Sequence, residues 1–494
     1  MQLNRLVDSL DYIEIINGTG KALDQIEIEA ICYDSRKAYS GSLFVCMEGS
    51  QSDGHKYAST AYIRMCKVFV AAHKIDDLPS DTVQIITKDT RAALACLADC
   101  FYDFPSSKMR VIGVTGTKGK TTSSLLIYEL MRACGVNAGY IGSNGVFFGD
   151  MHYKTINTTP ESLDLHYYMN RMIENGVDTL VMEVSSQALK QSRVHKIKFD
   201  VTVFTNLYPD HIGTFEHPDF DDYKSAKRSL FTSYGTDVIV FNADDQSYRD
   251  MIGGVDCEKV GFAINNPEAD YSASKIAYFK APGKLGVSFE CSVGGKKYPV
   301  SLSFPGEFSV YNAMTALAVC KRLGMPIDAL IKSMQKIKIK GRFETIELPN
   351  GATAVIDYAH NGVSLKAALA ALRIYDPKRL ICLFGSIGGR TSMRRAELGL
   401  VASRDADFCI ITSDNPDNEQ PTTIIGEIAS YFTAGSCPYI AIPDRKKAII
   451  YALENSEDGD IILLAGKGHE TYQLVNGVRE HFSEAEIISE YCQR

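Results

Sequence analysis

The chain contains 494 residues, of which 45% are hydrophobic and 23% are charged, and its formal net charge is −8. That length exceeds the roughly 300 residues that one hydrophobic core usually serves, so several domains are expected. The composition excludes a disordered chain, and the acidic balance with dispersed Lys and Arg disfavours a nucleic-acid partner. No uncharged apolar run reaches about eighteen residues, and we therefore expect a soluble, cytoplasmic protein with no membrane partner.

Short β-branched runs alternate with helical patterns from residue 111 onward, which predicts an α/β fold built on parallel sheets. The runs are apolar throughout, as in strands that helices cover on both faces. The first series comprises residues 111–115, 179–184, 201–205 and 238–241, and the second comprises residues 354–357, 380–384, 408–413 and 461–465. Between the two series, residues 283–304 alternate around Gly-Gly like an antiparallel hairpin, and residues 311–334 have a helical pattern.

These patterns divide the chain into three expected domains. Residues 1–105 form a smaller mixed α/β domain, residues 106–338 a central parallel-sheet domain with a phosphate loop (P-loop), and residues 339–494 a Rossmann-like parallel-sheet domain. Polar motifs follow the predicted strands of the last two domains: GTKGKTT and NLYPDH in the central one, and YAH, GSIGGR, DNPDNE and GKGHE in the last. Because ligands bind at the carboxyl ends of parallel strands, we expect two facing sites, one in each domain.

The motif GTKGKTT, residues 116–122, is typical of a phosphate-binding loop, although the strict pattern requires Gly at position 114 and this chain has Val. Its glycines allow backbone N–H groups to approach phosphate oxygens, and Lys120 supplies a positive charge. Thr121 offers a hydroxyl for Mg²⁺, and a helix beginning at Thr122 presents its positive end. The alternative is a glycine-rich turn that binds no nucleotide.

Three further residues of the central domain have both a functional and a structural interpretation. Glu183 ends an apolar strand, where it either binds a hard cation or forms a salt bridge or cap. His211, in PDH, is by itself more often structural, and Lys227, on a helical pattern, would by default be a solvated lysine.

The C-terminal domain has a different set of polar residues at three strand ends. Arg390 is a fixed cation, and Asp414, Asn415 and Glu470 carry oxygen atoms. This mixture suits a zwitterionic ligand, because a guanidinium binds a carboxylate and carboxylates bind amines. Taken singly, each residue is also a plausible loop cap.

Nine motifs occur in the order found in one known family: GTKGKTT, NTTPES, MEVSSQAL, TNLYPDHIGTFE, YKSAKRSLF, GRFE, DYAH, DNP and GKGHE. The whole chain resembles the Mur ligase family, and it is most similar to the members that add a diamino acid as the third residue of a UDP-linked muramoyl peptide. NTTPES together with EVSSQAL is highly specific for this resemblance, whereas the phosphate loop alone is not.

The resemblance implies a role for each domain and a set of residues for each ligand. The central ATPase domain and its C-terminal neighbour would bind ATP through Gly116, Thr117, Lys118, Gly119, Lys120, Thr121, Thr122, Asn312, Arg342 and Asp357. The N-terminal UDP-binding and central domains would bind the UDP-muramoyl peptide through Ser35, Arg36, Asn157, Thr158, Thr159, Ser185, Gln191 and Arg193. The C-terminal domain would bind the amino acid through Arg390, Asp414, Asn415, Asp417, Gly466 and Glu470. Catalysis and Mg²⁺ binding would rest on Lys120, Thr121, Glu183, His211 and Lys227, the last as a carbamate.

The implied activity is ATP-dependent formation of an amide bond in peptidoglycan precursor synthesis. ATP would phosphorylate the γ-carboxylate of D-Glu in UDP-MurNAc-L-Ala-D-Glu, and the amine of a diamino acid would displace phosphate from the acyl phosphate. Domain closure would bring the reactants together and limit hydrolysis. We expect the enzyme to act as a monomer on these two substrates and ATP.

The added amino acid is expected to be L-lysine, with meso-diaminopimelate as the alternative. Family members that select diaminopimelate have DNPR, whose Arg binds the distal carboxylate, whereas this chain has Asp417 at that position. An acidic side chain there would repel the carboxylate and favour a terminal ammonium. The chain also departs from the usual family pattern in NGVSL after DYAH and in GSIGGRTSMRR.

Two other activities remain open on the sequence. Folylpolyglutamate synthetase shares the ligase chemistry, but it normally lacks a UDP-binding first domain and NTTPES. A pseudo-enzyme, or a ligase-like subunit acting through a partner, belongs to a different class. Such subunits usually carry a four-cysteine metal ribbon in the central domain, which Cys257 and Cys291 alone do not provide. A nucleotide-binding regulator would have no use for an acceptor site.

Overall fold

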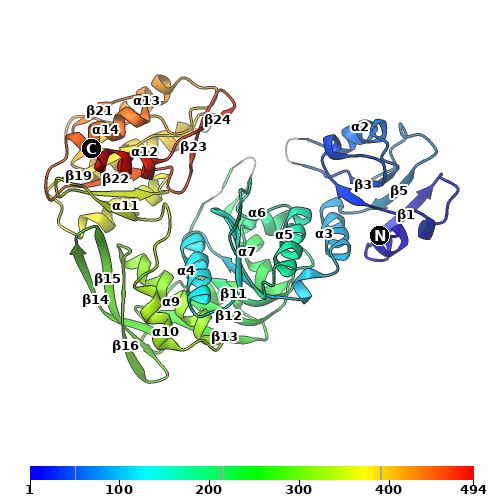
Figure 1. Cartoon of the computed structure of the whole chain (residues 1–494), viewed down its shortest axis with the longest axis horizontal. Coiled ribbons are helices and arrows are strands. Elements are labelled where there is room, and N and C mark those ends of the chain that lie inside the picture. Colours follow the sequence, from blue (N-terminus) through cyan, green and yellow to red (C-terminus); the bar gives the residue numbers. More distant parts are fainter. Residues whose placement is uncertain (50–51, 211, 214–215, 390–391, 494) are drawn as a thin grey trace. The chain divides into compact units, whose positions relative to one another are not determined.

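The computed structural model describes residues 1–49, 52–210, 212–213, 216–389 and 392–493 (Figure 1). The chain forms two compact units. The first comprises Met1–Ala269 and Thr315–Met325, and the second comprises Asp270–Met314 and Pro326–Arg494. The three-domain boundaries expected from the sequence remain a prediction. In the described residues, no helix combines the length and the apolar character that crossing a bilayer would require.

The first unit begins with a five-stranded sheet. Its order is β1 (Tyr12–Asn17), β5 (Val83–Thr87), β4 (Val68–Ala71), β3 (Ser42–Val45) and β2 (Ala30–Cys32), and only β1 is antiparallel to its neighbour. The buried strands are β-branched and apolar, as parallel strands require. Helix α3 (Thr90–Phe101) follows, and the Asp89 side chain caps it by accepting from the Arg91 and Ala92 amides.

The second sheet of this unit carries the phosphate loop. Its strands run in the order β13 (Glu258–Ala263), β12 (Thr236–Asn242), β11 (Phe199–Phe204), β6 (Arg110–Thr115), β10 (Thr179–Glu183), β7 (Ala138–Gly142), β8 (Gly145–Phe148) and β9 (Met151–Tyr153). Strands β7, β10, β6, β11, β12 and β13 are parallel. After β6 the chain forms β7 and then β10 on one side of β6, and it then forms β11 on the other side. The strand order therefore reverses at β6. An open α/β sheet binds its ligand at such a point.

The second unit begins with an antiparallel sheet of β14 (Tyr271–Ala281), β15 (Lys284–Val293) and β16 (Lys296–Leu302). Gly294 and Gly295 both have positive φ, +56° and +75°, as a type I′ hairpin turn requires, and the predicted hairpin is confirmed. The helix predicted at residues 311–334 is in fact two helices, α9 (Glu307–Arg322) and α10 (Ile327–Met334). Gly324, at φ +91°, and Pro326 separate them.

The C-terminal sheet has the order β17 (Glu344–Glu347), β18 (Thr353–Asp357), β22 (Ile461–Ala465), β19 (Leu380–Phe384), β20 (Phe408–Ile411) and β21 (Tyr439–Ala441), and all but β17 are parallel. Alternate residues of its strands pack against opposite layers of helices (Figure 1). Cys382 and Phe384 face α11 (Gly362–Arg373) and its neighbours, while Ile381 and Leu383 face α14 (Arg445–Glu454). The architecture is α/β, as predicted, with each predicted strand present.

Candidate active site

The phosphate loop joins β6 to helix α4 (Lys120–Ala133) and requires glycine at two positions. Gly116 and Gly119 have φ of +150° and +83°. A Cβ on Gly116 would lie 1.9 Å from the Thr205 hydroxyl oxygen, so the loop can approach the next strand end only as glycine. Thr205 donates to the Lys118 carbonyl at 2.7 Å and fixes this approach. The helix begins at Lys120, two residues before the predicted start, so its positive end lies at the loop.

The two lysines of the loop point in different directions. Lys120 donates to the carbonyl oxygens of Gly116 and Thr117 at 2.8 and 3.1 Å, so its ammonium lies over the loop. Lys118 forms an ion pair with Asp210 at 3.0 Å. Lys120 therefore lies where a phosphate would bind, whereas Lys118 helps to fasten the loop to the segment after β11.

Glu183 is fully buried at the end of β10 and lies beside Thr121. Its two carboxylate oxygens accept hydrogen bonds from the Thr121 hydroxyl at 2.9 Å, the Tyr140 hydroxyl at 2.7 Å and the Ser143 amide at 2.8 Å. No ion pair with Glu183 forms among the described residues, which removes the salt-bridge interpretation. The structure thus brings together the two oxygen ligands that the sequence assigns to a hard cation.

Lys227 lies on helix α7 (Phe220–Thr232) and is only 1% exposed, so the default expectation of a solvated lysine is wrong. Its ammonium donates to the Gly116 carbonyl at 2.9 Å and lies 4.6 Å from the centre of the Tyr223 ring. Burial, reinforced by the charge of Lys120, lowers the pKa of Lys227 well below its ordinary value. This setting disfavours the ammonium form relative to a solvated lysine.

The threonines of NTTPES join the same cluster. Thr159 donates to the Glu183 carbonyl at 2.8 Å and accepts from the Ser185 amide at 3.1 Å. Thr158 lies 3.0 Å from the hydroxyl of Ser143, which also bonds Glu183. Ser185 caps helix α6 (Ser186–Lys190) by accepting from the Ala188 amide. Four predicted residues from two distant motifs therefore meet at the end of β10.

Arg193 holds this loop in place from a buried position. It donates to the Thr159 carbonyl at 3.1 Å and to the Gln191 side chain at 2.6 Å, and it pairs with Glu161 at 2.9 Å. Glu161 in turn lies 3.4 Å from Arg91 on helix α3. The guanidinium charge of Arg193 is therefore balanced inside the protein. Arg193, together with Gln191, fixes the conformation of the NTTPES segment.

The residues predicted to bind uridine are more loosely connected to this cluster. Ser35 is buried at the start of a short 3₁₀ turn, and Arg36 is exposed and pairs with Asp34 at 2.7 Å. The neighbouring Tyr33 donates to Asp164 of helix α5 (Ser162–Glu174) at 2.6 Å and links the N-terminal sheet to the NTTPES segment. Asn157 is half-buried in that segment, and Thr122 lies half-buried in the first turn of α4.

In the second unit, Arg342 and Asp357 lie together. The Arg342 guanidinium stacks 4.8 Å from the Tyr358 ring centre, and Asp357 accepts from the Phe343 amide at 3.0 Å. Burial raises the pKa of Asp357 to about 6, although Arg342 opposes the shift. Asn312 is a separate, buried position on α9.

The residues predicted to bind the amino acid form a charged cluster around a lysine that sequence analysis did not select. Lys467 is fully buried and contacts the side-chain oxygens of Asn415 at 3.0 Å, Glu470 at 3.1 Å and Asp414 at 3.5 Å. Asn415 also donates to Glu470 at 3.0 Å. Lys467 stands in GKGHE, two residues after an apolar strand, and that position was the available signal. Two carboxylates surround one ammonium, which leaves the cluster one negative charge for an incoming amine.

Gly466 and Asp417 both have positive φ beside this cluster, and their binding of the amino acid stays a prediction. A Cβ on Gly466, at φ +114°, would lie 2.7 Å from an Asp414 carboxylate oxygen, so only glycine allows the close approach. Asp417 also has a positive φ, +51°, and its carboxylate accepts from the Gly477 amide at 2.9 Å. The Asp417 side chain thus caps the turn of the hairpin β23 (Tyr472–Val475) and β24 (Val478–His481). The electrostatic argument for L-lysine loses support from this contact.

Comparison with known proteins agrees with this geometry. The Mur ligase middle domain matches residues 114–320, and the Mur ligase glutamate ligase domain matches residues 341–468. A UDP-N-acetylmuramoyl-L-alanyl-D-glutamate–2,6-diaminopimelate ligase of Caldanaerobacter subterraneus subsp. tengcongensis is 37% identical and covers 97% of this chain and 98% of its own. The enzyme of the same name from Clostridioides difficile is 35% identical over 99% of both chains.

The chain belongs to the Mur ligase family. A solved structure of a 2,6-diaminopimelate-adding ligase matches with a TM-score of 0.69 and 25% identity, over 100% of this chain and 99% of that one. The fold and the ATP-dependent, amide-bond-forming ligase class predicted from the sequence are confirmed. The expectation of L-lysine is not confirmed, because the relatives favour the diaminopimelate alternative.

Two predicted residues of this Mur ligase, His211 and Arg390, lie outside the described residues. Among the described residues, no group of three His, Cys, Asp or Glu side chains forms a preassembled metal site. The Thr121–Glu183 pair supplies oxygen atoms that fit Mg²⁺, which usually takes few protein ligands together with phosphate oxygens.

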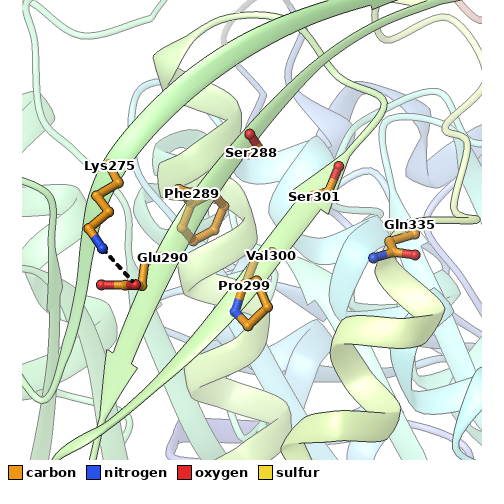
Figure 2. Close-up of a pocket in the computed structure, with 8 residues that line it drawn as sticks. All are labelled: Lys275, Ser288, Phe289, Glu290, Pro299, Val300, Ser301 and Gln335. Carbon is orange, nitrogen blue, oxygen red and sulfur yellow. Dashed lines mark hydrogen bonds and ion pairs between the residues drawn. The ribbon is translucent and has the colours of Figure 1, made fainter.

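A groove of about 320 Å³ lies elsewhere in the second unit, on the face of β15 and β16 beside α10 (Figure 2). Glu290 in this groove pairs with Lys275 at 3.2 Å and with Lys297 at 3.0 Å, and Gln335 borders the groove at the end of α10. No predicted site residue lines this groove, and its surface carries no set of groups suited to the ligase reaction.

Proposed function

We propose that this Mur ligase adds 2,6-diaminopimelate to the D-Glu γ-carboxylate of UDP-N-acetylmuramoyl-L-alanyl-D-glutamate, with ATP converted to ADP and phosphate. The observation that carries the proposal is the match, over nearly the full length, to relatives that bear this activity in their names. Asp414 and Glu470 carry two carboxylates, and the Lys467 ammonium offsets the charge of one, which supports an acceptor with an ammonium group. The capping role of Asp417 removes the main argument for L-lysine.

The first step would occur at the phosphate loop. A γ-carboxylate oxygen attacks the γ-phosphorus of ATP, the bond to the β-phosphate oxygen breaks, and ADP leaves. Lys120 and the N–H groups at the start of α4 stabilise the charge that spreads over the transferred phosphoryl oxygens. Thr159 and Ser185, held by Arg193, position the peptide beside Glu183.

The second step would join the amino acid. The neutral amine attacks the acyl carbon, a tetrahedral intermediate forms, and the nitrogen releases a proton to solvent as phosphate leaves and the amide forms. Asp414, Asn415 and Glu470 orient the amine-bearing acceptor through their side-chain oxygens. Arg342, half-buried against the Tyr358 ring, and the buried Asp357 would contact the nucleotide.

Thr121 and Glu183 would hold Mg²⁺, which neutralises phosphate charge when it is bound. His211 and Lys227 complete the proposed set. Lys227 would act as a carbamate, formed when its neutral amine adds CO₂ and releases a proton. The support is its burial without an acidic ion-pair partner among the described residues, a position that disfavours an ammonium.

Phosphate release by the purified protein tests the proposal, with ATP, Mg²⁺, UDP-muramoyl-Ala-Glu and either 2,6-diaminopimelate or L-lysine. We expect release that depends on diaminopimelate, with the higher kcat/KM for that acceptor. A higher kcat/KM for L-lysine would overturn the proposed amino acid but leave the ligase reaction. Lys120→Ala should reduce turnover by about 10³-fold, because one charge-stabilising donor is lost. Lys224→Ala on α7, at a pair with Asp250, is the matched comparison.

A further inference from the structure

A buried ion pair lies beneath the amino-acid cluster of the second unit. Arg445 begins α14, and Glu484 begins helix α15 (Glu484–Cys492). Their side chains are 0% and 1% exposed, and Arg445 contacts one Glu484 oxygen at 2.8 Å and 2.9 Å through two nitrogens. The other Glu484 oxygen has no hydrogen-bond partner among the residues that the structure describes. This pair takes no part in the reaction derived above.

The remaining hydrogen bonds of Arg445 reach two strand ends. Its guanidinium donates to the Ser413 carbonyl at 3.1 Å and to the Ala465 carbonyl at 2.9 Å. Ser413 immediately precedes Asp414, and Ala465 immediately precedes Gly466. The planar Arg445 guanidinium thus hydrogen-bonds to the main chain at the residues directly before Asp414 and Gly466, which belong to the cluster.

These two strand ends need a link of this kind. Strands β20 and β22 are not neighbours, because β19 lies between them, so no ladder hydrogen bond joins their ends. The ends nevertheless approach closely, since an Asp414 carboxylate oxygen lies 2.7 Å from where a Cβ on Gly466 would be and Lys467 reaches Asp414 at 3.5 Å. The spacing between the two loops therefore depends on contacts other than the strand ladder, from Arg445 and from Gln473, which donates to the Asp414 carbonyl at 2.7 Å.

A buried ion pair is a costly way to gain stability alone. Removing two charges from water costs several kcal/mol, and a well-packed apolar pair often gives equal or greater stability. The planar guanidinium offers something that an apolar pair lacks, which is directed donation to two carbonyl oxygens at once.

We propose that Arg445, oriented by Glu484, is a positioning residue that sets the spacing between Asp414 and the Gly466–Lys467 segment. It acts on the amino acid only through these residues. This inference rests on the proposed function for the assignment of the cluster to the amino acid, and it holds for either diamino acid.

The decisive variant is Arg445→Met combined with Glu484→Met, which removes both charges and leaves neither one buried alone. We expect a melting temperature close to that of the wild type, a rise of about tenfold or more in KM for the amino acid, and a KM for ATP within twofold of the wild-type value. A wild-type KM for the amino acid in this variant would overturn the proposal.

A second variant, Arg445→Lys, keeps the positive charge beside Glu484 but cannot bond both carbonyls in the same way. It should also raise KM for the amino acid about tenfold without changing KM for ATP, and an unchanged value would count against the proposal. Arg404→Lys, at an exposed pair with Asp405 in the same unit, is the matched control. If the wild type releases no phosphate in response to any amino acid, the proposed function fails. An unchanged KM in an active variant would instead overturn only the role of Arg445.

Discussion

The phosphate loop and the amino-acid cluster hold their lysines in opposite ways. Lys120 and Lys227 donate to main-chain carbonyl oxygens of the loop, at 2.8 and 2.9 Å to Gly116. Lys467 instead contacts the side chains of Asp414, Asn415 and Glu470. Lys120 and Lys227 thus contact main-chain dipoles, whereas Lys467 contacts two carboxylates and an amide oxygen.

This difference separates binding groups from scaffold groups. A carbonyl dipole satisfies an ammonium without cancelling its charge, so Lys120 remains attractive to phosphate oxygens. Lys467 is fully buried among acids, and it serves to fix their positions while lowering the net charge of the cluster. Lysines that look alike in GTKGKTT and GKGHE therefore have different tasks. The predictions that follow test this comparison.

The largest effect is expected at Lys227. Lys227→Ala should reduce turnover by about 10³-fold, because the buried position would then lack the carboxylate that carbamylation supplies for metal binding. ¹³C-labelled bicarbonate should give a carbamate carbon signal in the wild type that the variant lacks. Lys224→Ala on the same helix, whose exposed lysine pairs with Asp250, should retain activity. Full activity in Lys227→Ala would place this lysine among the scaffold groups.

A smaller but clear effect is expected at Glu183. Glu183→Gln keeps the shape and most hydrogen-bonding capacity of the side chain, but it removes the charge that a cation would require. We expect turnover to fall about 10²-fold and the Mg²⁺ dependence to move to higher concentration. Glu174→Gln, at an exposed pair with Arg171, provides the control. A wild-type Mg²⁺ dependence in Glu183→Gln would contradict the proposed metal site.

The predictable parts of this molecule are those that a local pattern encodes. Apolar runs identified the strands that hold the site, since a strand buried on both faces leaves few other choices of residue. The ends of these runs identified Thr121, Glu183, Asp414 and Glu470, because polar residues after buried parallel strands share one edge of a sheet. The contact of Thr121 with Glu183 follows from the strand order, because β6 and β10 are neighbours and place both residues at the same edge of the sheet.

The parts that sequence analysis missed depend on contacts between segments far apart in the chain. The burial of Lys227 cannot be read from its helix, because the phosphate loop that covers it lies 111 residues away. Arg445 was not selected, since nothing near it in sequence shows that its guanidinium reaches Ser413 and Ala465. The bond of Asp417 to Gly477 was likewise not visible in the sequence, and the assignment of Asp417 to the amino acid stays a prediction.

Asp417 gives the smallest expected effect and the most direct test of charge against scaffold. Asp417→Asn removes the charge but keeps an oxygen that can accept from the Gly477 amide. If Asp417 caps the hairpin, kcat/KM for 2,6-diaminopimelate and for L-lysine should each change by less than about threefold, since Asn keeps the oxygen that accepts from the Gly477 amide. If its charge instead repels a distal carboxylate, the same substitution should raise kcat/KM for diaminopimelate alone. Asp417→Ala separates the two further, because losing the cap should loosen β23 and β24 and weaken both acceptors equally. A selective gain with diaminopimelate would return Asp417 to the substrate-binding residues and revive the argument for L-lysine.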